Sequence, residues 1–240
     1  MCGIAGILSS DNNNINRERL KAMTEAVAHR GPDGEAFWIN EFGTVGFGHR
    51  RLSIIDLTEA AAQPMHYMGK YTIVYNGEIY NYIELKEELT RYGYQFVSKS
   101  DTEVILAAFD KWKYDCLDHF DGMFAFAIWD AAEQKLFAAR DRFGEKPFYY
   151  TVNDHTLYFG SEMKALWAAG IPKVVNEKML LNYITLGHLQ STQEKARTFF
   201  ENIFSIAPAH YFVYTLSEKS FIHRRYWDIN KNAEIKIHAD

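Results

Sequence analysis

The spacing of short apolar segments constrains the fold of this chain more than any other feature. Segments such as YTIVYN (71–76), MFAFAIWD (123–130) and KLFAAR (135–140) have the length and the aromatic or β-branched content of strands, and turn residues lie between them. Strands joined by short turns pair antiparallel, because a parallel pair needs a long crossover. We therefore expect mainly antiparallel sheets.

Helical periodicity separates these groups of strands. The overall order is strands, two helices, strands, two helices and a final group of strands. Helices in pairs must cover sheet faces, so the sequence predicts an α+β fold in which two antiparallel sheets pack together with helices outside. The expected helices cover 15–30, 83–93, 100–112, 161–170 and 176–187; further strands are expected at 2–8, 35–40, 44–49, 51–57, 148–152, 156–160, 199–206, 210–216 and 221–229.

Composition excludes several classes of function. The 240 residues carry a net charge of −5, and Lys and Arg gather on no segment, so neither nucleic acid nor a membrane is an expected partner. No apolar stretch approaches the ~20 residues that span a bilayer, and the first residues do not resemble a signal peptide. The two cysteines, Cys2 and Cys116, are too few for a disulfide framework and fit a reducing cytoplasm. Cys116 is expected to be a packed small apolar residue.

The first residues, MCGIAGIL, place a thiol at position 2. If Met1 is removed, Cys2 carries its own base, because an α-amine has a pKa of about 7.7–8.0 and a thiol one of about 8.5. Because the amine and the thiol belong to one residue, little entropy is lost when they are brought together. This predicts Cys2 as a nucleophile without a catalytic histidine. The alternative is a half-buried strand that happens to contain a small apolar residue.

Three further segments carry chemistry. In HRRLSIID (49–56), Arg51 could bind a carboxylate through two hydrogen bonds, unless the arginines are solvated surface residues. In YNGEIYN (75–81), Asn76 and Gly77 could form an oxyanion hole, although Asn-Gly is also an ordinary turn signal. In SDTE (100–103), Asp101 could hold an ammonium group or simply favour a helix N-terminus; Ser100 and Glu103 have the spacing of a capping box.

Together these groups describe one ligand. A thiol and an oxyanion hole act on an acyl carbon, Arg51 binds an α-carboxylate, and Glu78 and Asp101 bind an α-ammonium. The ligand is therefore an α-amino acid with a reactive side-chain carbonyl, and glutamine fits best.

The chain resembles the glutaminase domain of class II glutamine amidotransferases and, within them, the N-terminal domain of glutamine-hydrolysing asparagine synthetases. The resemblance covers most of residues 2–166 and continues more weakly through IFSIAPAHYFVY to RYWDI. The motifs that carry it are MCGIAGI, HRGPDG, HRRLSIID, AAQPM, YNGEIYN, SDTEVIL, GMFAFAIWD, RDRFGEKPFYY and SEMKAL.

This resemblance implies an N-terminal-nucleophile hydrolase fold with four αββα layers. It implies Cys2 as nucleophile, Asn76 and Gly77 as the oxyanion hole, and Arg51, Glu78 and Asp101 as glutamine contacts, with backbone groups of Ile54 and Ile55 lining the pocket. The chain departs from the family at Glu145, where an apolar residue is commoner, and at Ala209, where glycine is usual.

The resemblance also implies a partner domain. We expect 2–228 to be the glutaminase domain and 229–240 to begin a linker to an ATP-pyrophosphatase synthetase domain, because no phosphate-binding loop occurs here. ATP and magnesium are expected only in that domain, no cofactor is expected in this one, and the nine histidines show no metal-ligand spacing. The segment RDRFGEKPFYY mixes apolar and charged residues and is a candidate docking face, with an exposed turn as the equal alternative; a homodimer stays open.

The predicted reaction is hydrolysis of glutamine through a γ-glutamyl thioester, which supplies ammonia for asparagine synthesis from aspartate. Three alternatives remain: delivery of ammonia to another carboxylate in a surface-polysaccharide or peptide pathway, an N-terminal-nucleophile acylase that acts on another amide, and an inactive sensor or interaction domain.

Overall fold

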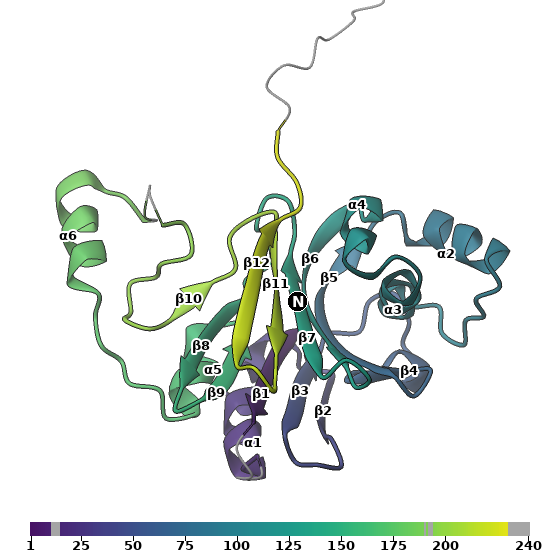
Figure 1. Cartoon of the computed structure of the whole chain (residues 1–240), viewed down its shortest axis with the longest axis horizontal. Coiled ribbons are helices and arrows are strands. Elements are labelled where there is room, and N and C mark those ends of the chain that lie inside the picture. Colours follow the sequence, from purple (N-terminus) through teal and green to yellow (C-terminus); the bar gives the residue numbers. More distant parts are fainter. Residues whose placement is uncertain (11–14, 190, 192–193, 230–240) are drawn as a thin grey trace, which may run out of the picture.

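The computed structural model describes residues 1–10, 15–189, 191 and 194–229, and its strands form two six-stranded antiparallel sheets (Figure 1). The first sheet has the strand order β10 (Phe204–Ser205), β8 (Tyr149–Asn153), β9 (Thr156–Gly160), β1 (Gly3–Ser9), β3 (Val45–Arg51), β2 (Gly34–Ile39). The second has the order β12 (Ser220–Arg225), β11 (His210–Thr215), β7 (Lys135–Arg140), β6 (Gly122–Asp130), β5 (Tyr71–Ile79), β4 (Met65–Tyr67). The predicted antiparallel pairing is confirmed.

The two sheets pack face to face over an aromatic core. Its largest fully buried side chains include Phe47, Trp129, Phe159 and Phe212, which come from both sheets. Because alternate residues of a strand point to opposite faces, each sheet also has an apolar outer face that needs a helical layer.

Helices cover both outer faces and complete the predicted αββα layers. On the first sheet, α1 (Arg17–Glu25) and α5 (Met163–Ala168) contribute Leu20 and Leu166 to the outer core. On the second, α2 (Tyr82–Arg91), α3 (Asp101–Trp112) and α4 (Cys116–His119) contribute such residues as Leu89, Ile105 and Cys116. Cys116 is fully buried, as expected. The helix α6 (Glu177–Leu186) lies apart from both sheets (Figure 1).

Strand β1 lies in the interior of its sheet, between β3 and β9. The glycines of MCGIAGIL fit this position, because a Cβ atom at Gly6 would lie 2.1 Å from the ring of Phe159. Every residue of β1 is buried. The N-terminal end of the chain is therefore fixed within the body of the protein.

Three predicted strands are wrong or shortened, and one of them, predicted over 221–229, ends at Arg225 as β12. Residues 52–57, predicted as strand, are irregular, because Asp56 accepts hydrogen bonds from the backbone and hydroxyl of Thr58 and Arg51 donates to the carbonyls of Asp56 and Thr58. Local polar contacts of this kind compete with a strand ladder. The strand predicted over 199–206 contracts to β10, and the short edge strand β4 was not predicted. Of the predicted linker, all but Ile229 lies outside the described residues.

The predicted capping box is also wrong in its reciprocal half. The hydroxyl of Ser100 caps α3 by accepting from the Thr102 N–H. The carboxylate of Glu103, however, accepts from the backbone N–H groups of Val97 and Ser98 and from the Ser98 hydroxyl. Glu103 therefore ties the preceding loop to the helix.

This arrangement predicts that Glu103→Ala lowers the free energy of unfolding by about 2–3 kcal/mol, because it leaves two backbone donors without a charged acceptor. Urea unfolding at pH 7 measures the change. The matched control is Glu87→Ala on the exposed surface of α2, which should change stability by less than about 0.5 kcal/mol. Equal losses in the two variants would contradict the bridging role of Glu103.

Candidate functional site

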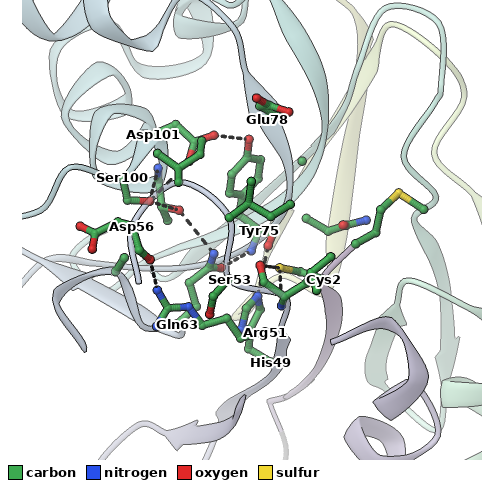
Figure 2. Close-up of a pocket in the computed structure, with 18 of the residues that line it drawn as sticks. Cys2, His49, Arg51, Ser53, Asp56, Gln63, Tyr75, Glu78, Ser100 and Asp101 are labelled. Carbon is green, nitrogen blue, oxygen red and sulfur yellow. Dashed lines mark hydrogen bonds between the residues drawn. The ribbon is translucent and has the colours of Figure 1, made fainter. Parts of the chain in front are cut away.

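All the residues predicted to form the site line one pocket. They are Cys2, Arg51, Ile54, Ile55, Asn76, Gly77, Glu78 and Asp101. The first sheet supplies Cys2 and Arg51, the second supplies Asn76 to Glu78 from β5, and α3 supplies Asp101 from its first turn. In Figure 2 the ring of Tyr75 lies between Cys2 and Asp101.

The thiol of Cys2 lies against the loop that follows β3. The Leu52 N–H donates to Sγ at 3.4 Å, and Sγ lies 3.6 Å from the Leu52 carbonyl oxygen. Burial raises the pKa of the Cys2 thiol, which outweighs the lowering by the Leu52 hydrogen bond, the amino terminus and Arg51. With Met1 attached, the thiol is therefore protonated at neutral pH and needs a base.

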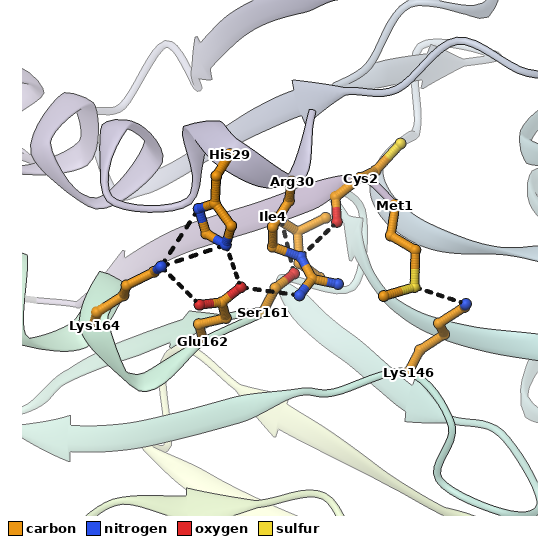
Figure 3. Close-up of polar contacts among 9 residues, drawn as sticks. All are labelled: Met1, Cys2, Ile4, His29, Arg30, Lys146, Ser161, Glu162 and Lys164. Carbon is orange, nitrogen blue, oxygen red and sulfur yellow. Dashed lines mark hydrogen bonds and ion pairs between the residues drawn. The ribbon is translucent and has the colours of Figure 1, made fainter. Parts of the chain in front are cut away.

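A polar network holds the backbone from Cys2 to Ile4 (Figure 3). Nε of Arg30 donates to the Cys2 carbonyl at 3.0 Å, and Nη1 of Arg30 pairs with Glu162 at 3.0 Å. The hydroxyl of Ser161 accepts from the Ile4 N–H at 3.0 Å. Burial raises the pKa of Glu162, but hydrogen bonds from Arg30, Lys164 and His29 outweigh it and lower the pKa to about 2. Glu162 is therefore an anion that holds Arg30 against Cys2.

Asn76 and Gly77 lie within β5, so the turn alternative is wrong. Asn76 pairs with Ala125 and Gly77 with Phe124 of β6. The side chain of Asn76 is 1% exposed, and its Nδ2 has no hydrogen-bond partner among the described residues. Buried polar groups are almost always paired, so this amide is a donor that can form a hydrogen bond with a group that enters the pocket.

The register directs the Gly77 N–H away from β6. Phe124 exchanges hydrogen bonds with Asp141 on the β7 side, so its backbone groups do not meet those of Gly77. Along the same edge of β5, the Tyr75 N–H donates to Gln63 and the Ile79 N–H donates to Asp101. The Gly77 N–H lies between these two on the pocket side. A Cβ atom at Gly77 would lie 2.3 Å from the Met123 carbonyl oxygen, which explains the glycine.

Asp101 combines both of its predicted roles in position. It is the first residue of α3, and its Oδ2 accepts from the Tyr75 hydroxyl at 2.7 Å and the Ile79 N–H at 3.0 Å. Burial raises the pKa of Asp101 against these hydrogen bonds. Its Oδ1 has only a long 3.4 Å contact with the Ser100 hydroxyl, so one oxygen stays available for a cation. Glu78 lies nearby without a bond to the residues drawn in Figure 2.

Of the two adjacent arginines, only Arg51 belongs to the pocket. Arg50 forms an ion pair with Glu35 at 2.7 Å. Arg51 donates to the carbonyls of Asp56 and Thr58, which curves the loop that carries Ile54 and Ile55 along the pocket wall. The interpretation of both arginines as solvated surface residues is therefore wrong.

The pocket residues that were not predicted include His49, Gln63, Tyr75 and Lys146. Gln63 and Tyr75 support the edge of β5, through the bonds described above. His49 is 1% exposed, and its Nε2 lies 3.3 Å from the Tyr75 carbonyl oxygen, so it links β3 to β5 across the two sheets. Burial lowers the pKa of His49 to about 4, with a further lowering by Arg51. His49 and Arg51 were predicted in separate strands, 44–49 and 51–57; the single strand β3 (Val45–Arg51) places them two residues apart and therefore on one face.

The described residues contain no group of three or more His, Cys, Asp or Glu side chains that could hold a metal ion. In the same part of the chain, no helix has the length and apolar character needed to cross a membrane.

Comparison with known proteins identifies the family. The family description "Glutamine amidotransferase domain" matches residues 1–227. The chain belongs to this family. Among curated relatives, asparagine synthetase [glutamine-hydrolyzing] 3 of Bacillus subtilis is 40% identical over 100% of this chain and 38% of its own length. The putative asparagine synthetase 2 of Methanocaldococcus jannaschii is 35% identical over 95% of this chain and 47% of its own. This chain is therefore a glutaminase domain of the asparagine-synthetase type, and it spans less than half of these relatives.

The solved structures agree on the fold. Glutamine phosphoribosylpyrophosphate amidotransferase of B. subtilis superposes with a TM-score of 0.67 at 16% identity, covering 93% of this chain and 49% of its own. The N-terminal-nucleophile fold expected from the sequence is confirmed. Of the two departures from the family pattern, Ala209 has a φ of 60°, a backbone conformation that favours glycine.

The neutral His49 predicts a pH dependence of stability. Its pKa is about 4 when folded and about 6.5 when unfolded, so the unfolded state binds the proton first as pH falls. Stability should drop by about 2 kcal/mol between pH 7 and pH 4.5 from this group. Urea unfolding at pH 7 and pH 4.5 measures this loss of stability. The loss should be about 2 kcal/mol smaller in His49→Gln than in the unmodified protein, whereas the exposed His155→Gln variant should lose as much as the unmodified protein. An unchanged pH dependence in His49→Gln would contradict the assignment.

Proposed function

We propose that this domain hydrolyses glutamine to glutamate and ammonia through a γ-glutamyl thioester on Cys2. The amine of Cys2 takes the thiol proton, and Sγ bonds to the side-chain carbonyl carbon of glutamine. The resulting oxyanion accepts hydrogen bonds from Asn76 Nδ2 and the Gly77 N–H. The C–N bond then breaks as the amine returns its proton to the leaving ammonia, and water hydrolyses the thioester.

The observation that carries this proposal is the unpaired, buried amide of Asn76 in the same pocket as the Cys2 thiol. An unpaired buried donor destabilises the folded protein, and an oxyanion removes that penalty when it forms. The other pocket residues support glutamine as the substrate. We assign its α-carboxylate to Arg51 and its α-ammonium to Asp101 and Glu78, and its length is accommodated along the wall formed by Ile54 and Ile55.

The mechanism requires that Met1 be removed, since otherwise the nitrogen of Cys2 is an amide. The raised pKa of the Cys2 thiol supports this requirement, because burial favours the neutral thiol. A free amine within the same residue supplies the missing base.

Cys2→Ala should abolish ammonia release from glutamine, because no other thiol of the described chain lines the pocket. A protein with a non-removable N-terminal extension should be inactive for a different reason, since it keeps the thiol and lacks the amine. Coupled measurement of glutamate formation tests both, and Cys116→Ala is the matched control with an unaffected pocket. Normal turnover by the extended protein would refute self-activation.

Asn76→Ala should lower kcat by about 10²–10³, with a smaller effect on KM, because its donor acts mainly on the charged tetrahedral oxygen. Steady-state kinetics with glutamine measures both constants, and circular dichroism checks that β5 is intact. A variant impaired only in KM would assign Asn76 to substrate binding instead.

We further propose that residues 2–228 form the glutaminase domain of a longer protein, and that its ammonia serves ATP-dependent asparagine synthesis from aspartate in a C-terminal ATP-pyrophosphatase domain reached through a linker from 229. The relatives that are named asparagine synthetases support asparagine as the product. Delivery to another carboxylate stays the alternative, because the acceptor site lies outside this chain. We expect no cofactor here, with ATP and magnesium acting only in the synthetase domain. The two free thiols support a cytoplasmic location.

The candidate docking face for that domain is the segment between β7 and β8. Phe143 is 69% exposed and stacks edge-on with Trp227, close to the end of the described chain. Arg142 lies over the same Trp227 ring at 5.7 Å, and its Nε is buried without a partner in the described structure. An exposed aromatic beside an unsatisfied cation supports a protein contact at this place.

A further inference from the structure

Lys146 is a buried lysine with no anionic partner. Its side chain is 5% exposed, and it forms no ion pair with any carboxylate in the described part of the chain. The contact recorded for its Nζ is the Met1 Sδ, at 3.0 Å (Figure 3). Lysine is seldom buried unless it is paired, and a thioether is a weak acceptor. This position therefore needs an explanation.

The fold places Lys146 in this position rigidly. Its backbone N–H donates to Asp141 Oδ2 at 3.0 Å, and its carbonyl accepts from Arg140 Nε at 2.6 Å. Asp141 is occupied by the backbone N–H groups of Phe124, Phe143, Glu145 and Lys146 itself. The nearby carboxylate thus holds the loop and leaves the Lys146 ammonium directed to the pocket.

The contact with Met1 limits the distance between the Lys146 ammonium and the Cys2 nitrogen. Sδ of Met1 is joined to the Cys2 nitrogen through the Met1 side chain and carbonyl carbon, so Nζ is within about 9 Å of that nitrogen. Both residues line the same pocket. When Met1 is removed, Lys146 loses its thioether contact and faces the newly formed amine.

We propose that Lys146 is a positioning residue that acts through its positive charge. This charge favours the unprotonated amine and the thiolate of Cys2. This rests on the proposed function. A nearby cation disfavours the state in which the Cys2 amine and thiol are both protonated, so the form with one proton fewer, which carries the reaction, persists to lower pH. No new bond is formed, and the only proton moved is the one that passes from Sγ to the amine.

The other charged groups facing Cys2 have partners within the protein or in the substrate, although two carboxylates share the single ammonium of glutamine. Arg30 is paired with Glu162. In the proposed complex Arg51 binds the glutamine carboxylate, and Asp101 and Glu78 bind its ammonium.

The pocket contains two further titratable groups. His49 is neutral at pH 7, because burial lowers its pKa to about 4. Asp56 is held by the Lys99 N–H and by Thr58. Lys146 is the cation of the pocket that forms no ion pair with the described residues or, in the proposed complex, with the substrate, so its effect should appear in kcat as well as in kcat/KM.

The test is the pH profile of glutaminase activity in Lys146→Met and Lys146→Gln, both of which keep an unbranched stem and remove the charge. The acid limb of kcat and of kcat/KM should move up by about one pH unit in each variant, with activity recovering at pH 9. Lys146→Arg should restore the original limb. Exposed Lys111→Met is the control and should leave the profile unchanged.

The rate of Cys2 alkylation by iodoacetamide at each pH gives a second readout without substrate. It should show the same upward shift in the charge-removing variants. Loss of activity at every pH with an unshifted alkylation profile would make Lys146 structural and overturn the proposal, as would unshifted limbs in active variants. If the unmodified protein with a free Cys2 amine failed to hydrolyse glutamine at any pH, the proposed function itself would fail.

Discussion

The enclosure of β1 within its sheet is the constraint on which the rest of the site depends. A strand paired on both sides cannot shift its register without moving every side chain to the opposite face. Beyond the paired segment, Ser161 and Arg30 take over the backbone groups of Ile4 and Cys2. The thiol is thereby fixed in space even though it lies next to a chain terminus, where order is usually lost.

The second sheet supplies the hydrogen-bond donors that act together with the Cys2 thiol. Strand β5 extends past the short edge strand β4, so its backbone groups at Tyr75, Gly77 and Ile79 are free to face side chains or a ligand. The bond between His49 and the Tyr75 carbonyl joins the two sheets beside this open edge. Nucleophile and oxyanion donors therefore come from different sheets, and their distance is set by the packing of the aromatic core. Burial of that core stabilises the fold and the geometry of the site together.

Much of this could be predicted from the sequence, because strand length, turn residues and helical periodicity are local signals. The strands β7 and β9 match their predicted bounds, and all the predicted site residues meet in one pocket. The misses have long-range or polar causes. Residues 52–57 look β-branched, yet Asp56 and Arg51 fold them into a loop. Asn76-Gly77 has the composition of a turn, and only its pairing with β6 shows that it is strand.

The residues that were missed share a physical reason. Glu162, Ser161 and Lys146 belong to the motifs SEMKAL and RDRFGEKPFYY, but they lie far from Cys2 in the chain, and no spacing pattern predicts their contacts with the N-terminal residues. His49 was in a motif already singled out, but its role depends on complete burial between two sheets. Motifs thus located the groups expected to touch a substrate, whereas the groups that hold them became visible only in the fold.

The most direct test of the account is intact-mass and peptide mass spectrometry of protein quenched in acid during turnover of glutamine. The account predicts a chain that begins at Cys2, with one γ-glutamyl group attached as a thioester to that residue and removable by hydroxylamine. A turning-over protein that keeps Met1, or that carries the glutamyl group on any other residue, would contradict it.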